Sequence, residues 1–170
     1  MDQNKNKTVT VLEDALVNEF RIFQSLVALS REELDSLTRR DSQRLSVLVE
    51  EKESLLDELS QLEESRRMAT EDLAYAAGLN LEMPAVSDVL PYLDKMTHDR
   101  LKRILEGIIA LGREIRNLNR TNMVLAKTAL DWADATQSYL INLHQPEFET
   151  YAPGGVAKRQ NAVRSFDHWV

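Results

Sequence analysis

The chain has 170 residues, of which 43% are hydrophobic and 29% charged, and it contains 5 glycines and 4 prolines. So few helix-breaking residues in a chain rich in Leu, Glu, Arg and Ala favour one all-α domain with room for a tail. Cysteine is absent and the 3 histidines are scattered, which excludes disulfides and argues against a metal site. The net charge of −7 argues against a general nucleic-acid-binding protein.

The start of the chain is polar, and residues 1–7 contain no apolar stretch of the kind that a signal peptide needs. No long apolar run follows, so we expect a cytoplasmic protein that does not insert into a membrane. Apolar residues then recur every three, four or seven positions. This spacing predicts a first helix over about residues 8–37, with Thr8 as its N-cap.

The apolar pattern lapses at residues 38–42, where Leu37 and Leu45 are one residue further apart than a heptad. We predict a helical hairpin here, with Asp41 or Ser42 as the N-cap of a second helix over about residues 42–77. The alternative is one continuous helix, because neither Gly nor Pro enforces a turn. Gly78 is expected to end the second helix in the left-handed conformation.

Two basic residues interrupt the apolar heptad positions of the second helix, namely Lys52 and Arg66. Such residues either fix the register and the choice of helix partner or extend their charged ends into water. The connection that follows holds Pro84 and Pro91. A brief apolar pattern within it predicts a short helix over residues 87–94.

The most regular pattern lies between Leu101 and Leu143, inside a long helix predicted over residues 98–144 with Thr97 or Asp99 as its cap. Its a and d heptad positions are apolar apart from Asn122 and Thr136, which is typical of a helix packed lengthwise on other helices. This length predicts an elongated, coiled-coil-like bundle. Two glycines inside the helix, Gly107 and Gly112, predict close approach of a neighbouring helix.

Two asparagines of the long helix, Asn119 and Asn122, lie at or beside its a positions. One interpretation is that they hydrogen-bond across the core, with Arg66 or Lys52 as partners, and set the register. The other is a direct role in binding a partner.

The tail, residues 145–170, follows a helical bundle that we place at residues 1–144. Pro146 and then Pro153-Gly154-Gly155 break the chain, so we expect the tail to be flexible. Its last residues form a small amphipathic pattern of Val163, Phe166, Trp169 and Val170. This pattern predicts either a docking segment for a partner or a segment that folds back onto the bundle.

Sequence signatures of catalysis are missing: there is no phosphate-binding loop, dinucleotide fingerprint, zinc motif or pair of carboxylates for a di-iron bundle. We therefore predict a protein that is not an enzyme, needs no cofactor and no metal, and acts by binding another protein.

Three blocks, in this order, resemble the FlgN-type flagellar export chaperones over about residues 8–156. They are Glu50–Leu56 with Leu62-Glu63 and Arg66-Arg67, then Leu118-Asn119 with Asn122 and Leu125, then Thr150–Gly155. The resemblance implies a left-handed bundle of long helices, which supports the antiparallel hairpin over the continuous helix.

The resemblance also implies a cytoplasmic, non-enzymatic chaperone. It would hold the two hook–filament junction proteins unassembled and bring them to the type III export gate. The C-terminal segment would engage the substrates, and Tyr151 would contact the export-gate membrane protein. Val163, Phe166, Trp169 and Val170 are assigned to substrate contact from their apolar spacing. The competing interpretation is a structural coiled-coil adaptor that acts by self-association; we expect a monomer or a weak homodimer.

Overall fold

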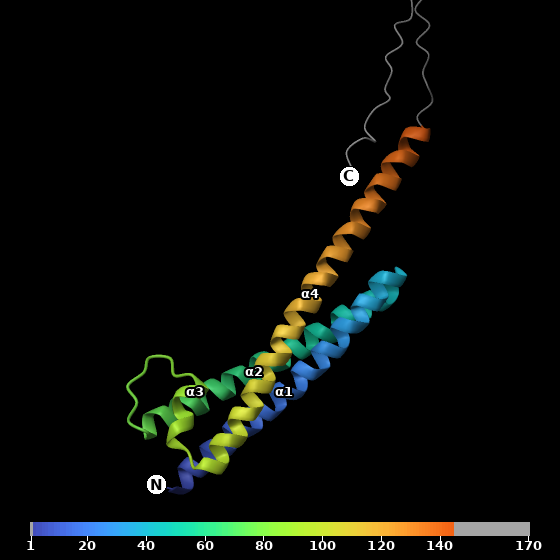
Figure 1. The fold of residues 1–170 in the computed structure, drawn as a ribbon. Coiled ribbons are helices and arrows are strands. Elements are labelled where there is room, and N and C mark those ends of the chain that lie inside the picture. Colours follow the sequence, from blue (N-terminus) through green and yellow to red (C-terminus); the bar gives the residue numbers. More distant parts are fainter. Residues whose placement is uncertain (1, 145–170) are drawn as a thin grey trace, which may run out of the picture. The chain divides into compact units, whose positions relative to one another are not determined.

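In a computed structural model, described for residues 2–144, the only secondary structure is helical, with no strand in that range. The elements are α1 (Asp2–Arg39), α2 (Ser42–Ala76), α3 (Val86–Val89), the short 3-10 helix η1 (Leu90–Tyr92) and α4 (Lys95–His144) (Figure 1). The all-α prediction is confirmed. Within the described range, no helix combines the length and apolar composition that a membrane span requires.

The chain divides into two compact units, Met1–Trp132 and Ala133–Val170. The first unit holds the packed helices. Of the second unit the structure describes residues 133–144, which are helical.

The predicted hairpin is confirmed, and the continuous helix is wrong. Arg40 takes the left-handed conformation with φ of 59°, and the N–H of Asp41 bonds the carbonyl of Ser36 at 2.9 Å. The Asp41 side chain then accepts a hydrogen bond from the Arg44 N–H at 3.0 Å and caps α2. A left-handed residue that closes the last turn of a helix is ordinarily glycine, so the identity of Arg40 gives no sequence signal for this turn.

The other helix ends agree with the sequence in part. Gly78 ends α2 with φ of +74°, as predicted, and the Leu79 N–H bonds the carbonyl of Ala74. Two cap predictions are wrong. Thr8 lies within α1, and α4 begins at Lys95, where the Asp94 carboxylate accepts from the Thr97 N–H at 3.1 Å. Hydrogen bonds from the side chain and the backbone N–H of Thr97 lower the pKa of the Asp94 carboxyl group.

The three long helices pack against one another within the first unit. Arg66 bonds Glu19 and Lys52 bonds Glu33, so α2 runs antiparallel to α1. Arg100 bonds Glu13 at 2.6 Å, and Asn119, later on α4, accepts a hydrogen bond from Ser30, later on α1. The two helices therefore run parallel. The core cluster where the three helices meet α3 and η1 contains Leu12, Leu16, Ala69, Leu73, Ala74, Val86, Val89, Leu90, Leu101 and Ile108.

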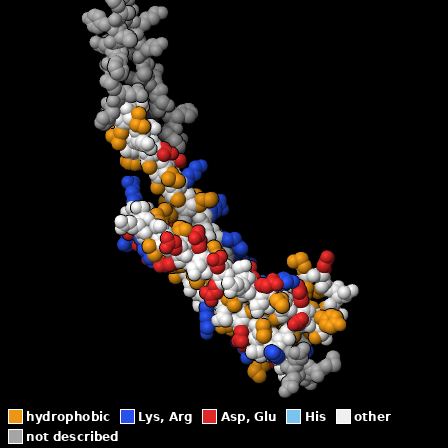
Figure 2. All heavy atoms as spheres, turned by 180° about the vertical axis from the view of Figure 1, so that it is seen from behind, with side chains coloured by type: hydrophobic (Ala, Val, Ile, Leu, Met, Phe, Trp, Pro, Cys, Tyr) orange, Lys and Arg blue, Asp and Glu red, His pale blue; other side chains and the backbone are white. Residues whose placement is uncertain are grey.

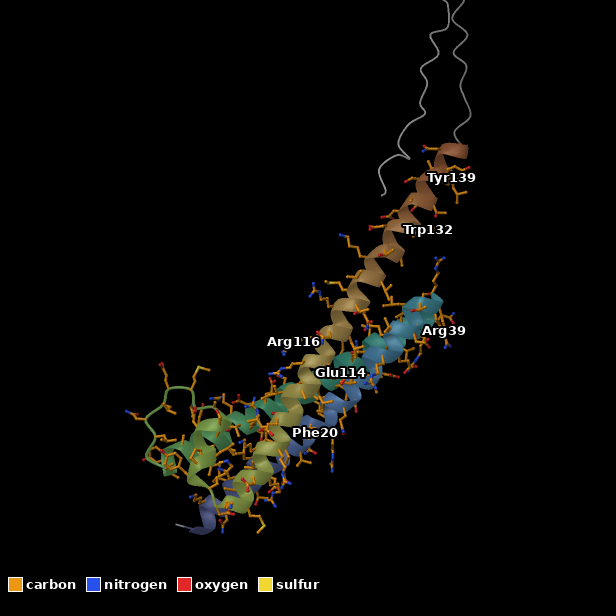
Figure 3. All side chains as sticks on the ribbon, in the orientation of Figure 1. Phe20, Arg39, Glu114, Arg116, Trp132 and Tyr139 are labelled. Atoms are coloured by element: carbon orange, nitrogen blue, oxygen red, sulfur yellow. The ribbon has the colours of Figure 1, made fainter. Side chains whose placement is uncertain are left out.

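Of the two glycines of α4, one marks the predicted close approach to α1. A Cβ atom added at Gly107 would lie 2.7 Å from the ring of Phe20, which is labelled on α1 in Figure 3. At Gly112 the nearest atom, on the ring of Phe23, would be 3.4 Å away, which is ordinary contact. Only Gly107 is therefore required by the packing.

Candidate partner-binding surface

Three ion pairs join α1 to α2: Arg44 with Glu32 near the hairpin turn, and two deeper pairs that fix the register of the helices. Lys52 Nζ lies 2.6 Å from Glu33 Oε2, and Arg66 Nε lies 2.7 Å from Glu19 Oε1. The acids are two heptads apart on α1 and the bases two heptads apart on α2. A slip of one helix past the other would therefore break both pairs at once.

Glu19 is the more deeply placed of the two acids, with 4% of its surface exposed. Burial raises the pKa of its carboxyl group, and the hydrogen bond and charge of Arg66 oppose that rise. Lys52 and Arg66 stood out in the sequence as basic residues at apolar heptad positions, whereas their acidic partners did not. The signal was present, because Glu19 and Glu33 repeat on α1 at the spacing of the two bases on α2.

A polar junction, formed by Ser30, Glu33, Lys52, Asn119 and Asn122, connects α1, α2 and α4. Asn122 is 4% exposed, and its Nδ2 donates to the Ser30 carbonyl at 2.9 Å and to Glu33 Oε2 at 2.6 Å. Asn119 is exposed, and its Oδ1 accepts from the Ser30 hydroxyl at 3.3 Å. The asparagines thus bond Ser30 and Glu33 of α1 rather than Lys52 or Arg66. The Oδ1 atom of Asn122 has no hydrogen-bond partner among the described residues.

The character of α4 changes after the polar junction. Before it, the b and c heptad positions, which face away from the a and d positions, are mixed: Lys102, Arg103, Ile109, Ala110, Arg116 and Asn117. Between the junction and Trp132, three of the four such positions are large and apolar, namely Met123, Val124 and Leu130, and the fourth is Asp131. Apolar side chains therefore extend around the helix beyond its a and d stripe.

These later apolar residues are exposed in the first unit. Met123, Leu130 and Trp132 expose 68%, 65% and 63% of their surfaces, whereas Leu101 exposes 0%. We call the set Met123, Val124, Leu125, Leu130 and Trp132 the exposed α4 segment. Its last member, Trp132, follows Arg116 along α4 (Figure 3), and the Arg40 guanidinium lies over its ring, 5.4 Å from the centroid. In the second unit, Tyr139, Leu140 and Ile141 are also exposed.

An exposed group of large apolar side chains on a helix is a surface for binding another apolar surface. Among the described residues, no cluster of His, Cys, Asp or Glu side chains has the arrangement of a metal site. The predicted tail residues Tyr151, Val163, Phe166, Trp169 and Val170 lie outside the described residues. The chemistry that this surface supports is hydrophobic association of helices.

Comparison with known proteins gave one match. The family model described as FlgN protein matches residues 1–159 of the chain. No curated protein and no solved structure matched it.

Proposed function

The chain belongs to the FlgN family of flagellar export chaperones, and we propose that it binds the hook–filament junction proteins in the cytoplasm and delivers them to the type III export gate. The family is one of chaperones and not of enzymes. The observation that carries the finer proposal is the exposed α4 segment, whose large apolar side chains are accessible to a partner.

The mechanism that we propose is physical masking. Junction proteins polymerise through amphipathic terminal helices that pair as coiled coils. A chaperone helix with apolar residues on several faces offers such a terminal helix an alternative partner, helix on helix. Met123, Leu130 and Trp132 supply large side chains for that contact. The substrate must be released at the gate, so an interface of moderate affinity suits the role.

The tail is proposed as the second part of the substrate site. Phe166 and Trp169 are the large apolar residues of its amphipathic end. A segment that orders only when it binds loses conformational entropy at that moment, which keeps the affinity moderate for the area buried. The exposed α4 segment and the tail would then hold the same substrate helix.

The test is a titration of full-length chaperone with a purified junction protein, measured by calorimetry. Replacing Phe166 and Trp169 together with Ala is expected to weaken binding while helix content and melting stay unchanged. Met123→Glu with Leu130→Glu is expected to weaken it as well, because each charge would enter an apolar contact. Tyr75→Ala is the matched control, since Tyr75 is an exposed aromatic residue of α2. Full-strength binding by both test variants would contradict the proposal.

Delivery is assigned to a different residue. We expect Tyr151→Ala to leave junction-protein binding intact and to reduce export of the junction proteins, measured as their amount in the culture medium. Loss of junction-protein binding in this variant would contradict the division between binding and delivery.

A structural adaptor that acts by self-association is the alternative. Lys52, Arg66 and Asn122, the polar residues of the heptad pattern, already have partners within the chain, so they require no second copy. Sedimentation at micromolar concentration separates the two functions. We expect a monomer or weak dimer that forms a complex with a junction protein, whereas a stable dimer with no such complex would favour the adaptor.

A further inference from the structure

The α1–α2 hairpin has a second uncovered face, which we call the outer groove. Two open hollows lie on it, and among the described residues both are lined by α1 and α2 alone. The larger, about 500 Å³, is lined by Ser25, Ala28, Leu29, Glu51, Ser54 and Leu55. The smaller, about 310 Å³, lies between Val11 of α1 and Met68 of α2. Helix α4 contributes to neither.

The floor of the outer groove suits a helix. Its large side chains are apolar, and Val11 and Met68 are exposed. Ser25, Ala28 and Ser54 are small, which allows close approach of another backbone. A helix laid between α1 and α2 here would complete a four-helix arrangement, because α4 packs elsewhere on the hairpin.

One rim of the outer groove is acidic. Carboxylates repeat along α2 at heptad spacing, and we call this row the acidic ridge: Glu50, Glu51, Asp57, Glu58, Glu64, Glu71 and Asp72. Glu51 and Asp72 also line the two hollows. Figure 2 shows one face of the molecule on which acidic side chains gather beside apolar ones.

Part of the acidic ridge is neutralised within the chain and part is not. Arg44 pairs with Glu51, and Arg67 pairs with Glu64 and Glu71. Glu50, Asp57, Glu58 and Asp72 form no ion pair among the described residues. A row of such carboxylates beside an apolar floor repels an acidic partner and attracts a basic one.

The opposite rim, on α1, carries both signs. Its groove-facing positions recur at heptad spacing from Lys7 and Val11, and they include Asp14, Arg21 and Glu32. The outer groove of a second copy therefore brings no row of basic residues to match the acidic ridge, so face-to-face pairing of two outer grooves is disfavoured.

We propose that the outer groove binds an amphipathic helix of another protein, one whose apolar stripe is flanked on one side by Lys or Arg at heptad spacing. The apolar stripe would fill the two hollows, and the basic row would lie along the acidic ridge. Among the described residues, this site shares no residue with the exposed α4 segment. The chaperone thus has a surface for a second partner that does not compete with the substrate.

The probe is a synthetic helical peptide with a Leu and Ala stripe and a flanking row of Lys, labelled for fluorescence anisotropy and titrated with the full-length chain. The control peptide has Glu in place of each Lys. We expect the Lys peptide to bind and the Glu peptide to bind at least about tenfold more weakly. Binding of the Lys peptide is expected to weaken as salt is added.

Chain variants separate a specific groove from general charge attraction. Ala28→Trp fills the larger hollow without changing charge and is expected to weaken Lys-peptide binding about tenfold. Asp57→Lys with Glu58→Lys should weaken it by about as much or more. Glu106→Lys is the matched control, because Glu106 is an exposed carboxylate of α4 without an ion pair among the described residues. Circular dichroism checks that each variant stays helical.

Four outcomes would overturn the proposal. The first is unchanged Lys-peptide binding by Ala28→Trp, and the second is a loss of Lys-peptide binding in Glu106→Lys as large as in Asp57→Lys with Glu58→Lys. The third is a dimer of the natural chain that the Ala28→Trp substitution dissociates. The fourth is tighter Lys-peptide binding when Phe166 and Trp169 are replaced by Ala. The third would assign the groove to a second copy, and the fourth to the chain's own tail. Junction-protein binding by Ala28→Trp is expected to be normal, so failure here leaves the proposed function intact.

Discussion

The two parts of α4 in the first unit share an apolar pattern at the a and d positions and have opposite surroundings. Around Leu101 and Ile108 the apolar side chains are buried by α1, α2 and the short helices. From Met123 to Trp132 equally large apolar side chains are exposed. The polar junction at Asn122 lies between these parts. A heptad pattern therefore indicates that a residue suits a helix partner, but not whether the same chain supplies that partner.

The largest expected effect tests this contrast with one substitution at two places. Leu101→Ala should destabilise the fold by about 3 kcal/mol, because it leaves a cavity in a fully buried site. Leu130→Ala should change stability by no more than about 0.5 kcal/mol, because Leu130 is mostly exposed. Chemical denaturation measures both. Equal losses would show that Leu130 is covered in solution.

The second prediction concerns the hairpin that covers the first part of α4. Arg66→Ala leaves the Glu19 carboxylate buried without its partner and should cost about 2 kcal/mol. Arg67→Ala is the matched control, since Arg67 is half exposed and its pairs with Glu64 and Glu71 lie at the surface. Its cost should stay below about 1 kcal/mol. A larger loss for Arg67 than for Arg66 would contradict the register assignment.

The third prediction uses the two glycines of α4. Gly107→Ala should destabilise by about 1 kcal/mol, because the steric conflict with Phe20 outweighs the gain in helix propensity. Gly112→Ala has room at Phe23 and should stabilise by up to about 1 kcal/mol. Thermal unfolding of both variants measures the difference. Stabilisation by both substitutions would mean that α1 and α4 approach less closely at Gly107.

The smallest effect is the pH dependence that Glu19 contributes. Because burial raises its pKa in the folded state, folding favours the protonated form. Stability from this group is fully present below the ordinary pKa of 4.5 and is lost as pH rises through the raised value. The unfolding free energy of the natural chain relative to Glu19→Gln should therefore fall over that interval. A constant difference would contradict the raised pKa.

The helix ends and the hairpin that depend on a short stretch of sequence could be predicted. Asp41 as a cap, Gly78 as a left-handed terminator and the hairpin all follow from short-range chemistry. Arg40 was missed because a positively charged residue gives no signal for the left-handed conformation. Glu19 and Glu33 could not be predicted from the pattern of α1 alone, because their partners lie on α2.

Exposure of the later part of α4 depends on long-range geometry. α1 runs beside α4 as far as Trp132, since Asn122 bonds Ser30 and Glu33 and the Arg40 guanidinium lies over the Trp132 ring. The neighbouring helices cover only one side of α4 there. The heptad pattern could not show which of residues 123–132 stay exposed, because that depends on the packing offset between the helices.

The most direct test of the proposed function is hydrogen–deuterium exchange on α4, with and without a bound hook–filament junction protein. We predict added protection at residues 123–132 and unchanged exchange at residues 101–118, whose apolar side already packs within the first unit around Leu101 and Ile108. Protection that appears only at residues 101–118, or none on α4 in a complex that has formed, would contradict the assignment of the exposed α4 segment to substrate binding.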